Sequence, residues 1–552
     1  MSPSANTRIV FLGGLGEIGR NMMVFETAGK LLVVDVGLSF PNEEMLGVDL
    51  VLPDFSYVVD RAQDCVGVVL THGHEDHVGA LTWFLREVEV PIHGTPLTLG
   101  LARRRLDEHG VHAKMIPLQA PGRGQIGPFD CTFFPVSHSI PDAMGISLKT
   151  DDGRILYTSD FKLDEAPIDG RHTDVGLIAE LAEEGVDLLL SDSTNVETPG
   201  RTPSESIVGD ALRDIFGTAK RRIIVACFAS NLHRVQQVLT AAEEAGRKVA
   251  LAGRSMISNV EVGRDLGHVK VSDDTLIELD TVDDHHPQDL VIVCTGSQGE
   301  PLSALSLIAA GEHKWVKIQP GDTVILSASP IPGNESAVHR VVNGLYRAGA
   351  EVFHNEMAPV HASGHAASEE LEEMLRIVHP RNFTPVHGEF RHLALHAHLA
   401  ERVGIPPDRI RMVEDGDVLE LSHGRVTRGE PVRAGTILVD GLGVGDVGPV
   451  VLRDRRHLAG DGILVCVVAL DSHTGELVSG PDLISRGFVH MDESRDFLDE
   501  AAERVADAVE ALERDQVQDW AAVKKACRKA LGEFVWRETR RRPMILPIVM
   551  DV

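Results

Sequence analysis

The chain of 552 residues is poor in cysteine and in aromatic residues, and each shortage limits the kinds of site or core that the protein can have. No cysteine belongs to a Cys-x-x-Cys pair, which argues against a disulfide-framed secreted domain and against a thiolate metal site. Aromatic residues make up only 4%, so the cores must be built from Val, Leu, Ile and Ala. We interpret the six cysteines as reduced, mostly buried thiols: Cys65, Cys131, Cys227, Cys294, Cys466 and Cys527.

The sequence also lacks a long apolar run. The longest, Ile463–Leu470, is far too short to span a membrane, and the first residues show no basic stretch leading into an apolar segment. A cytoplasmic location is therefore the default expectation. With 43% hydrophobic and 25% charged residues, the composition is that of a globular protein long enough for several domains.

A basic excess is missing too, since the formal net charge is −30. That charge argues against non-specific attraction of nucleic acid by the field of the whole protein, although it leaves room for a local basic channel. Runs of basic residues are more often solvated surface than binding sites. The candidate clusters are Arg103-Arg104-Arg105, Lys220-Arg221-Arg222, Arg453/Arg455/Arg456 and Arg540-Arg541-Arg542.

Short strands and helices alternate along the chain and suggest an organisation in domains. The pattern predicts a layered α/β domain for residues 1–203 and βαβ units with a parallel sheet for 204–375. Residues 376–450 again show short strands and are expected to complete the first domain. A linker at 451–460 precedes a small α+β domain at 461–552. Its first helix carries an apolar face with helical spacing: Phe497, Ala501, Val505, Ala508 and Leu512.

A glycine motif near the N-terminus imitates a dinucleotide-binding fingerprint. Gly14, Gly16 and Gly19 follow a predicted strand, and Asp35 lies further on at the expected distance. A Rossmann unit needs a helix between Gly19 and the strand that ends at Asp35. The segment instead predicts two strands joined by a turn at Ala28-Gly29-Lys30, so we expect a β-hairpin and a tight loop beside an active site.

The most informative stretch follows the apolar strand Val68–Leu70. It carries His72, His74, Asp76 and His77 within six residues. Imidazole and carboxylate suit zinc or manganese, and histidines at i and i+2 in extended chain project to one side and can clamp one ion. Asp76 and His77, past the turn, can face a second ion. The alternative is a histidine-rich surface loop, which the preceding buried strand makes the weaker interpretation.

Further ligands are expected at the ends of other strands. His138, Asp160 and His387 each follow a predicted strand. Any one of them alone would more often be an ordinary loop residue. Together they extend the carboxyl ends of strands in one α/β layer, so the sequence predicts that they meet.

The His-x-His-x-Asp-His pattern resembles the metallo-β-lactamase superfamily. The resemblance implies an αββα sandwich, and it gives Asp35 the role of holding the ligand loop from behind. It assigns the metal ligands in two groups, His72, His74 and His138 for one ion and Asp76, His77 and His387 for the other, with Asp160 bridging.

The long stretch between Asp160 and His387 resembles the β-CASP group of nucleic-acid processing enzymes, which carries an inserted α/β domain there. Asp192 matches the first signature of that group and His365 the second. The resemblance implies substrate binding by two segments: Phe228, Ala229 and Ser230, and His361, Ala362, Ser363, Gly364 and His365.

Further stretches match a more specific pattern: Phe11–Asn21, Met45–Asp54, Asp440–Gly448 and the α+β tail. Taken whole, the chain is similar to the bacterial ribonuclease J family. That resemblance implies 5′→3′ exonuclease and endonuclease activity on single-stranded RNA in RNA maturation and decay, including rRNA processing. It also implies two zinc ions per subunit, with manganese as the alternative, a homodimer or homotetramer, and contact with other RNA-degradation proteins. Some members hold calcium, at positions that match Gly47, Asp49 and Asp440, although a plain surface loop is an alternative there.

The mechanism implied is an in-line attack on phosphorus by a metal-activated water, which leaves a 5′-phosphate. Asp76, Asp192 and His365 are the expected catalytic residues. His365 would stabilise the transition state or protonate the leaving 3′-oxygen. The alternative role is to position phosphate only.

Three competing functions remain open at this point. A small-molecule metallohydrolase such as a lactonase needs no large insertion, which this chain has. A DNA-directed β-CASP nuclease would carry the same residues. A non-catalytic RNA-binding scaffold is disfavoured, because degenerate scaffolds usually lose metal ligands.

Overall fold

The computed structural model describes residues 6–42, 44–300, 302–331, 333–471, 474, 476–490, 494–517 and 519–552. It divides the chain into two compact units, one formed by Met1–Phe40 and Leu50–Ile437 and the other by Pro41–Asp49 and Leu438–Val552. Among the helices that it describes, none has the length and apolar character needed to cross a membrane.

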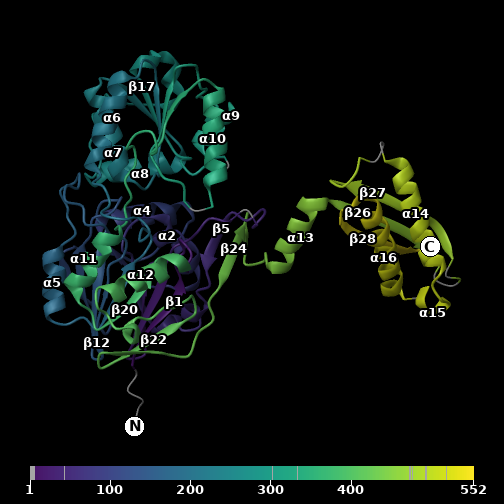
Figure 1. The fold of residues 1–552 in the computed structure, drawn as a ribbon, viewed down its shortest axis with the longest axis horizontal. Coiled ribbons are helices and arrows are strands. Elements are labelled where there is room, and N and C mark those ends of the chain that lie inside the picture. Colours follow the sequence, from purple (N-terminus) through teal and green to yellow (C-terminus); the bar gives the residue numbers. More distant parts are fainter. Residues whose placement is uncertain are drawn as a thin grey trace, which may run out of the picture. The chain divides into compact units, whose positions relative to one another are not determined.

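Two mixed β-sheets form the sandwich domain of the first unit (Figure 1). In spatial order, one sheet consists of β23 (Arg425–Arg428), β22 (Val418–Ser422), β1 (Thr7–Gly13), β3 (Met22–Thr27), β4 (Lys30–Val34), β6 (Cys65–Val69), β7 (Ile92–Gly94) and β8 (Met115–Pro117). The other consists of β20 (Asn382–Val386), β13 (Leu188–Asp192), β12 (Gly153–Tyr157), β11 (Met144–Thr150), β10 (Phe129–Pro135) and β9 (Gly122–Ile126).

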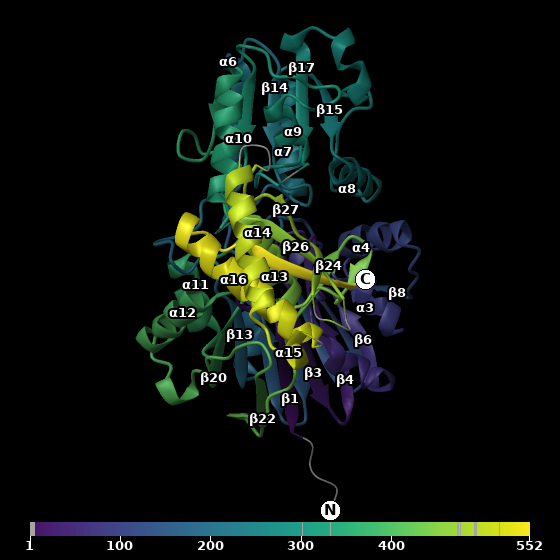
Figure 2. The same ribbon diagram turned by 90° about the vertical axis from the view of Figure 1, so that its right-hand side faces the viewer.

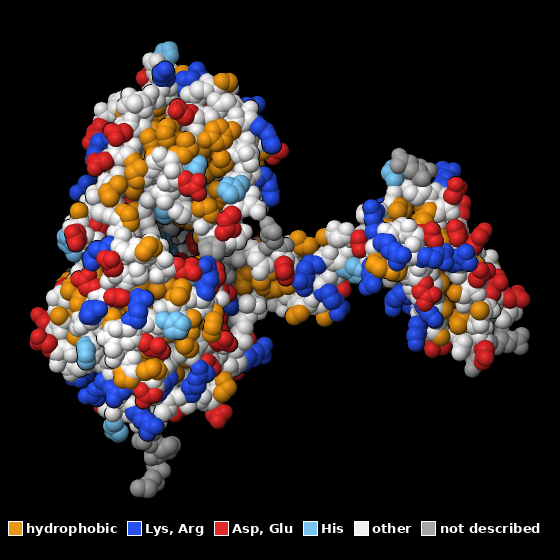
Figure 3. Space-filling model, viewed as in Figure 1, with side chains coloured by type: hydrophobic (Ala, Val, Ile, Leu, Met, Phe, Trp, Pro, Cys, Tyr) orange, Lys and Arg blue, Asp and Glu red, His pale blue; other side chains and the backbone are white. Residues whose placement is uncertain are grey.

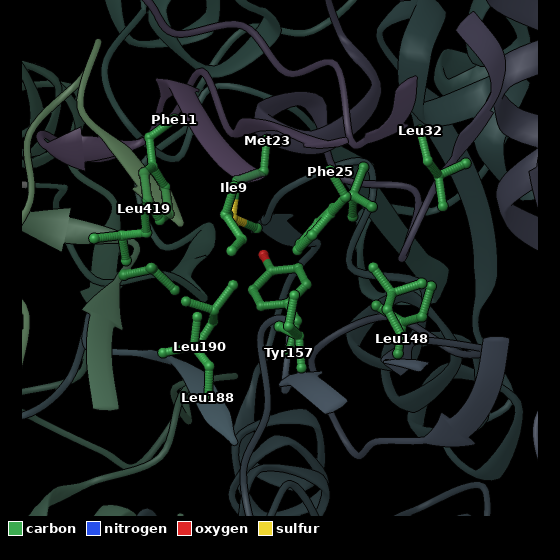
Figure 4. Close-up of a cluster of buried hydrophobic side chains, with 14 of the residues drawn as sticks. Ile9, Phe11, Met23, Phe25, Leu32, Leu148, Tyr157, Leu188, Leu190 and Leu419 are labelled. Carbon is green, nitrogen blue, oxygen red and sulfur yellow. The ribbon is translucent and has the colours of Figure 1, made fainter. Parts of the chain in front are cut away.

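The core of the sandwich lies between the two sheets (Figure 4). Successive side chains of a strand point to opposite faces, so every second residue faces inward. Ile9 and Phe25 point inward from one sheet and meet Tyr157, Leu188 and Leu190 from the other. All five are buried.

Helices cover the outer faces of both sheets. Leu189, between two inward-facing leucines, packs outward in a cluster with Ile178 and Leu371. The helices on that side are α5 (Val175–Glu183), α11 (Ser368–Val378) and α12 (Phe390–Arg402). At the other sheet, α4 (Pro96–Glu108) contacts β7 and β8, with α3 (Leu81–Glu87) beside it. The predicted αββα architecture is confirmed.

The inserted domain, residues 206–353, is built around an all-parallel sheet with a helix layer on each face, as Figure 1 shows, and Figure 2 gives the same domain turned by 90°. Ile223 and Val225 face one layer, and Ile224 and Ala226 face the other. The strands in order are β16 (Leu276–Ile277), β15 (Lys248–Ala252), β17 (Leu290–Cys294), β14 (Ile223–Ala226), β18 (Thr323–Leu326) and β19 (Glu351–Phe353). The two layers are α6 (Ser206–Thr218), α7 (Leu232–Glu244) and α8 (Arg254–Asp265), and α9 (Ala304–Ala310) and α10 (Glu335–Arg347).

The second unit contains the predicted α+β tail. Its sheet has the order β27 (Leu477–Arg486), β26 (Ile463–Leu470) and β28 (Met544–Asp551), and it packs on α14 (Arg495–Glu510) and α16 (Trp520–Thr539). The expected linker at 451–460 is not irregular chain, since it lies in helix α13 (Pro449–Asp461). The most deeply buried residues of α14 are Leu498, Ala501, Val505 and Val509, so its inner face is shifted slightly from the predicted one.

The glycine-rich N-terminal loop is followed by the predicted hairpin. β3 and β4 pair antiparallel, with Met23 opposite Val34 and Thr27 opposite Lys30. No helix separates Gly19 from Asp35. Gly14 has a φ of +91°, and a Cβ there would lie 2.3 Å from Oδ1 of Asn21. The glycine therefore serves a tight loop and not a dinucleotide site.

Candidate metal centre

Three neighbouring parallel strands carry polar residues where they end. Asp160 follows β12, Asp192 ends β13 and His387 follows β20. Carboxyl ends of parallel strands lie at one edge of a sheet, so these side chains meet. The loops after β6 and β10 bring His72 and His138 to the same place, with 4.9 Å between their ring centres.

The first group of potential ligands consists of three histidines, His72, His74 and His138, whose ligand nitrogens lie within 4.8 Å of one another. Nδ1 of His74 is 3.1 Å from Nε2 of His72 and 3.1 Å from Nε2 of His138. Burial lowers the pKa of all three imidazoles, to about 4 for His74. They are therefore neutral at pH 7 and offer lone pairs to a cation.

The second group is rich in carboxylates: Asp76, His77, Asp160 and His387. Nε2 of His387 lies 3.5 Å from Oδ2 of Asp76, and Nε2 of His77 lies 3.2 Å from Oδ2 of Asp160. Burial works against charge on His77 and His387, but Asp160 and the other nearby carboxylates raise the pKa of both well above its ordinary value. Burial likewise disfavours the Asp160 carboxylate, yet His387 and His77 bring its pKa well below its ordinary value.

Asp160 lies between the two groups and suits a bridge. Its Oδ2 is 3.7 Å from Nε2 of His72, 3.2 Å from Nε2 of His77 and 3.8 Å from Nε2 of His138. Nε2 of His387 is buried and has no hydrogen-bond partner, as expected of an atom that faces a cation. The imidazole and carboxylate set thus fits two divalent cations that share Asp160.

The sequence pointed to Asp35, but not to Thr71, as a residue that orients the ligands. Oδ2 of Asp35 accepts from Nδ1 of His77 at 2.8 Å and from the Thr71 hydroxyl at 2.8 Å. Because that hydroxyl donates to Asp35, it accepts from Nδ1 of His72 at 3.1 Å. Both histidines therefore turn Nε2 toward the site, a common second layer around metal ligands. Burial raises the pKa of Asp35.

Asn21, at the end of the glycine-rich loop, was also missed from the sequence. Its side-chain amide donates to the carbonyl of Asp76 at 3.1 Å and lies 3.1 Å from Nε2 of His77. Gly37 packs directly against the same loop, since a Cβ on Gly37 would lie 1.6 Å from the carbonyl oxygen of Asp76. The glycine motif next to Asn21 was the available signal, although it indicated only a tight loop.

His365 and Asp192 form a pair beside the second group, and with Asp160 and His387 they form a third set of potential ligands. Nδ1 of His365 donates to Oδ2 of Asp192 at 2.8 Å, and it lies 4.0 Å from Oδ2 of Asp160. Burial opposes charge on His365, but Asp192 outweighs it and raises the pKa. Thr194, another residue that sequence reasoning missed, places its hydroxyl 3.2 Å from Nδ1 of His387. A protonated imidazole beside the two groups can donate a proton or stabilise negative charge.

The two predicted substrate-binding segments pack on one apolar cluster. Ala362 is buried in it and Ala229 packs against it. Arg234, in α7 just after Phe228–Ser230, donates to the carbonyl of Val360 at 2.7 Å, next to His361. Within the second segment, the Ser363 hydroxyl accepts from the amide of His365 at 3.1 Å.

Arg455 lies among the residues that match a calcium site. Asp440 forms an ion pair with Arg455, whose guanidinium also donates to the carbonyl of Leu46 at 2.8 Å. A Cβ on Gly47 would lie 2.8 Å from Nη1 of Arg455. Asp49 accepts from the amide of Gly441 at 2.8 Å. A cation at Asp440 would thus require this guanidinium to leave, and calcium binding stays an untested prediction.

Several of the basic clusters are held in ion pairs. Arg104 pairs with Glu261, Arg222 with Asp322 and Arg456 with Glu44. Acidic and basic side chains are interspersed over the face in Figure 3. Guanidiniums of Arg540 and Arg542 stack over Trp536, at 5.5 and 4.5 Å from its ring centre. Arg222 and Asp322 are buried, so their pair belongs to the interior of the domain, whereas the exposed pairs of Arg104 and Arg456 favour the solvated-surface interpretation.

Comparison with known proteins covers nearly the whole chain. Family models match at residues 15–197 (metallo-beta-lactamase superfamily), 220–345 (ribonuclease J, beta-CASP domain), 355–409 (Zn-dependent metallo-hydrolase RNA specificity domain) and 450–552 (ribonuclease J C-terminal domain). Ribonuclease J2 of Bacillus subtilis is 43% identical, over 99% of both chains. Ribonuclease J of Mycolicibacterium smegmatis is 42% identical, over 99% of this chain and 97% of that one.

A crystal structure of a protein of unknown function from Enterococcus faecalis has the same fold. It matches with a TM-score of 0.53 and 16% identity, over 77% of this chain and 100% of that one.

The sandwich, its inserted domain and its two groups of ligands define a metallo-β-lactamase-type hydrolase of the β-CASP group. The full-length identity goes further, and the chain belongs to the ribonuclease J family. It is accordingly a metal-dependent ribonuclease.

Proposed function

We propose that the chain hydrolyses phosphodiester bonds of single-stranded RNA by 5′→3′ exonuclease and endonuclease action, leaving 5′-phosphate ends. The observation that carries the proposal is the position of Asp160, whose Oδ2 lies 3.7 Å from Nε2 of His72 and 3.2 Å from Nε2 of His77, with the His365–Asp192 pair beside it. Its cellular role is RNA maturation and decay, including rRNA processing. The full-length likeness to ribonuclease J proteins supports this role.

The proposed ligands are those of the two groups. His72, His74 and His138 would hold one divalent cation, Asp76, His77 and His387 would hold the other, and Asp160 would contribute to both. Zinc is the first choice and manganese the alternative, because imidazole and carboxylate donors suit both. When bound, the cations supply a nucleophilic water at neutral pH and neutralise charge on the phosphate oxygens.

The chain's own residues have separate roles. His365 protonates the leaving 3′-oxygen, and Asp192 raises the pKa of that imidazole and orients it through Nδ1. Asp35 and Thr71 orient two of the histidine ligands. Since phosphate and sugar contacts carry no sequence information, base specificity should be weak.

The 5′ end of the RNA binds at the two packed segments. Phe228–Ser230 and His361–His365 offer backbone amides, hydroxyls and imidazoles, which are donors suited to a terminal monophosphate. Such a pocket fixes the distance from the terminus to the scissile bond and would release one nucleotide at a time.

We propose the domain division of residues 1–203 and 376–450 for the metallo-β-lactamase domain, 204–375 for the β-CASP domain and 461–552 for the C-terminal domain after 451–460. The protein acts in the cytoplasm as a homodimer or homotetramer, together with other RNA-degradation proteins. The family resemblance supports these points.

A cleavage assay tests the proposal. The substrate is single-stranded RNA with a 5′-monophosphate, labelled at its 5′ end, and the protein is tested with and without a chelator. Asp76→Ala should abolish metal-dependent release of labelled mononucleotide. Glu75→Ala is the matched control, since this neighbouring carboxylate pairs with Arg105 outside both groups.

Longer labelled fragments would show that endonuclease cleavage dominates. No cleavage of RNA after metal is restored would overturn the proposal. Turnover of 2′-deoxy or lactone substrates would then support a DNA-directed nuclease or a small-molecule hydrolase.

A further inference from the structure

One metal-ligand candidate is held by a residue from outside the sandwich strands. Nδ1 of His138 donates to the carbonyl of Gly364 at 2.7 Å, and both residues are buried. A carbonyl only accepts, so the proton is on Nδ1 and Nε2 of the neutral ring keeps its lone pair. That Nε2 lies 3.1 Å from Nδ1 of His74 and faces the first group.

The contact requires a glycine for reasons of space. A Cβ on Gly364 would lie 2.7 Å from both Nδ1 and Cε1 of His138 and 3.0 Å from the amide of Ser139. Its φ is not in the left-handed region, so backbone conformation does not demand glycine. Close approach to the imidazole does, because any side chain would push the segment away from His138.

The segment that contains Gly364, His361–His365, also contacts Asp192, which lies beside the second group of ligands. His365, next to Gly364, donates to Asp192. Its carbonyl accepts from the Thr202 hydroxyl at 2.7 Å, and its amide donates to the Ser363 hydroxyl. The segment is therefore tied at several points, and a displacement at Gly364 cannot be absorbed by free movement of one residue.

We infer that Gly364 is a positioning residue for His138. Its carbonyl orients the ring and raises the basicity of Nε2, so the second segment of the RNA site completes the first metal group. This inference rests on the proposed function for its ligand assignment. Loss of such an outer hydrogen bond commonly weakens metal binding by about 10- to 100-fold.

The test is zinc binding by the full-length chain, measured by competition with a chromophoric chelator. Gly364→Ala should bind one of two zinc ions about 10- to 100-fold more weakly and leave the other unchanged. Gly176→Ala is the matched control, because the same substitution in helix α5 would place its Cβ no closer than 3.5 Å to a neighbouring atom. The control variant should bind both zinc ions with the affinities of the wild type.

Unchanged binding of both ions by Gly364→Ala would overturn the inference. If that variant does not fold, the wild-type chain with 15N-labelled histidine gives the answer by nuclear magnetic resonance. We expect the neutral His138 ring to be protonated at Nδ1, and protonation at Nε2 would overturn the inference equally. Neither readout uses RNA, so a failure of the proposed nuclease activity would be seen separately.

Discussion

The sandwich domain and the inserted domain use parallel strands in the same way but place different chemistry at the strand ends. In the sandwich, β12 and β20 are followed by Asp160 and His387. In the inserted domain, Ser327 follows β18 and Ser297 comes shortly after β17. Equivalent topology thus yields a metal centre in one region and small hydroxyl side chains in the other. Function resides in the residues after the strands and not in the fold.

The two regions also differ in how buried charge is balanced. In the inserted domain, the fully buried Arg234 donates to Glu205 at 2.7 Å and to the carbonyl of Val360 at 2.7 Å. In the sandwich, Asp76 and Asp160 share a group with His77 and His387, and Nε2 of His387 is buried without a hydrogen-bond partner. The Arg234–Glu205 pair is a balanced cluster that serves stability, whereas carboxylates gathered with imidazoles at strand ends offer ligands to a cation.

The largest effect should come from Asp160→Asn. Removing the shared carboxylate should lower RNA cleavage by roughly a thousandfold or more, because both cations lose a ligand. Metal content, measured by mass spectrometry of the purified chain, should fall in parallel. The metal-free variant should still fold. Normal metal content with normal cleavage would contradict the assignment of the metal centre to the strand ends of the sandwich.

Arg234→Met tests the balanced cluster in the inserted domain. It leaves Glu205 buried without its partner and should lower the free energy of unfolding by about 3–5 kcal/mol. The double variant Arg234→Met, Glu205→Gln should recover part of that loss. Urea unfolding followed by circular dichroism measures both, and equal stability of the single variant and the wild type would refute the assignment.

Asp415 is a partly buried carboxylate that pairs with Arg20 and belongs to neither ligand group. Burial raises its pKa to about 7, and Arg20, 3.3 Å away, only partly opposes this. Since the folded pKa exceeds the unfolded value of about 3.9, stability is lost as pH rises between these two values. Asp415→Asn should therefore raise the free energy of unfolding by about 1–2 kcal/mol at pH 8, because the carboxyl keeps some contact with solvent.

The same substitution should have almost no effect at about pH 3, below both pKa values, where the wild-type carboxyl is neutral in the folded and the unfolded chain. A gain that is equal at both pH values would show that charge is not the cause.

The smallest effect should be that of Ser363→Ala. Loss of one hydroxyl from the proposed phosphate pocket should reduce the preference for monophosphorylated over triphosphorylated 5′ ends by about fivefold, in keeping with one hydrogen bond. The ratio of kcat/KM values for the two RNAs measures it. A fall in cleavage of both RNAs by the same factor would mean that Ser363 helps to hold the metal centre in place and does not select the 5′ end.

The ligands could be predicted because each follows an apolar strand, a pattern visible in local sequence. His72, Asp160 and His387 are of this kind. Their orienting partners could not be predicted in this way. Thr71 acts through its contact with Asp35, and Gly364 touches His138 across 226 positions of sequence, so no local pattern connects them.

The architecture was predictable for a similar reason, since alternating and continuous apolar runs indicate strands. Helix α13 was not, because its sequence is rich in charge and contains no buried residue to show a helical face. The inner face of α14 was partly missed because Leu498 and Val509 neighbour equally apolar residues.

The most direct test is a metal titration of the metal-free chain, with release of 5′-labelled mononucleotide as the readout. Two ligand groups that share Asp160 should act together, so cleavage should stay low up to one zinc or manganese ion per chain and rise with the second. Full activity at one ion per chain, or without added metal, would contradict the two-group centre.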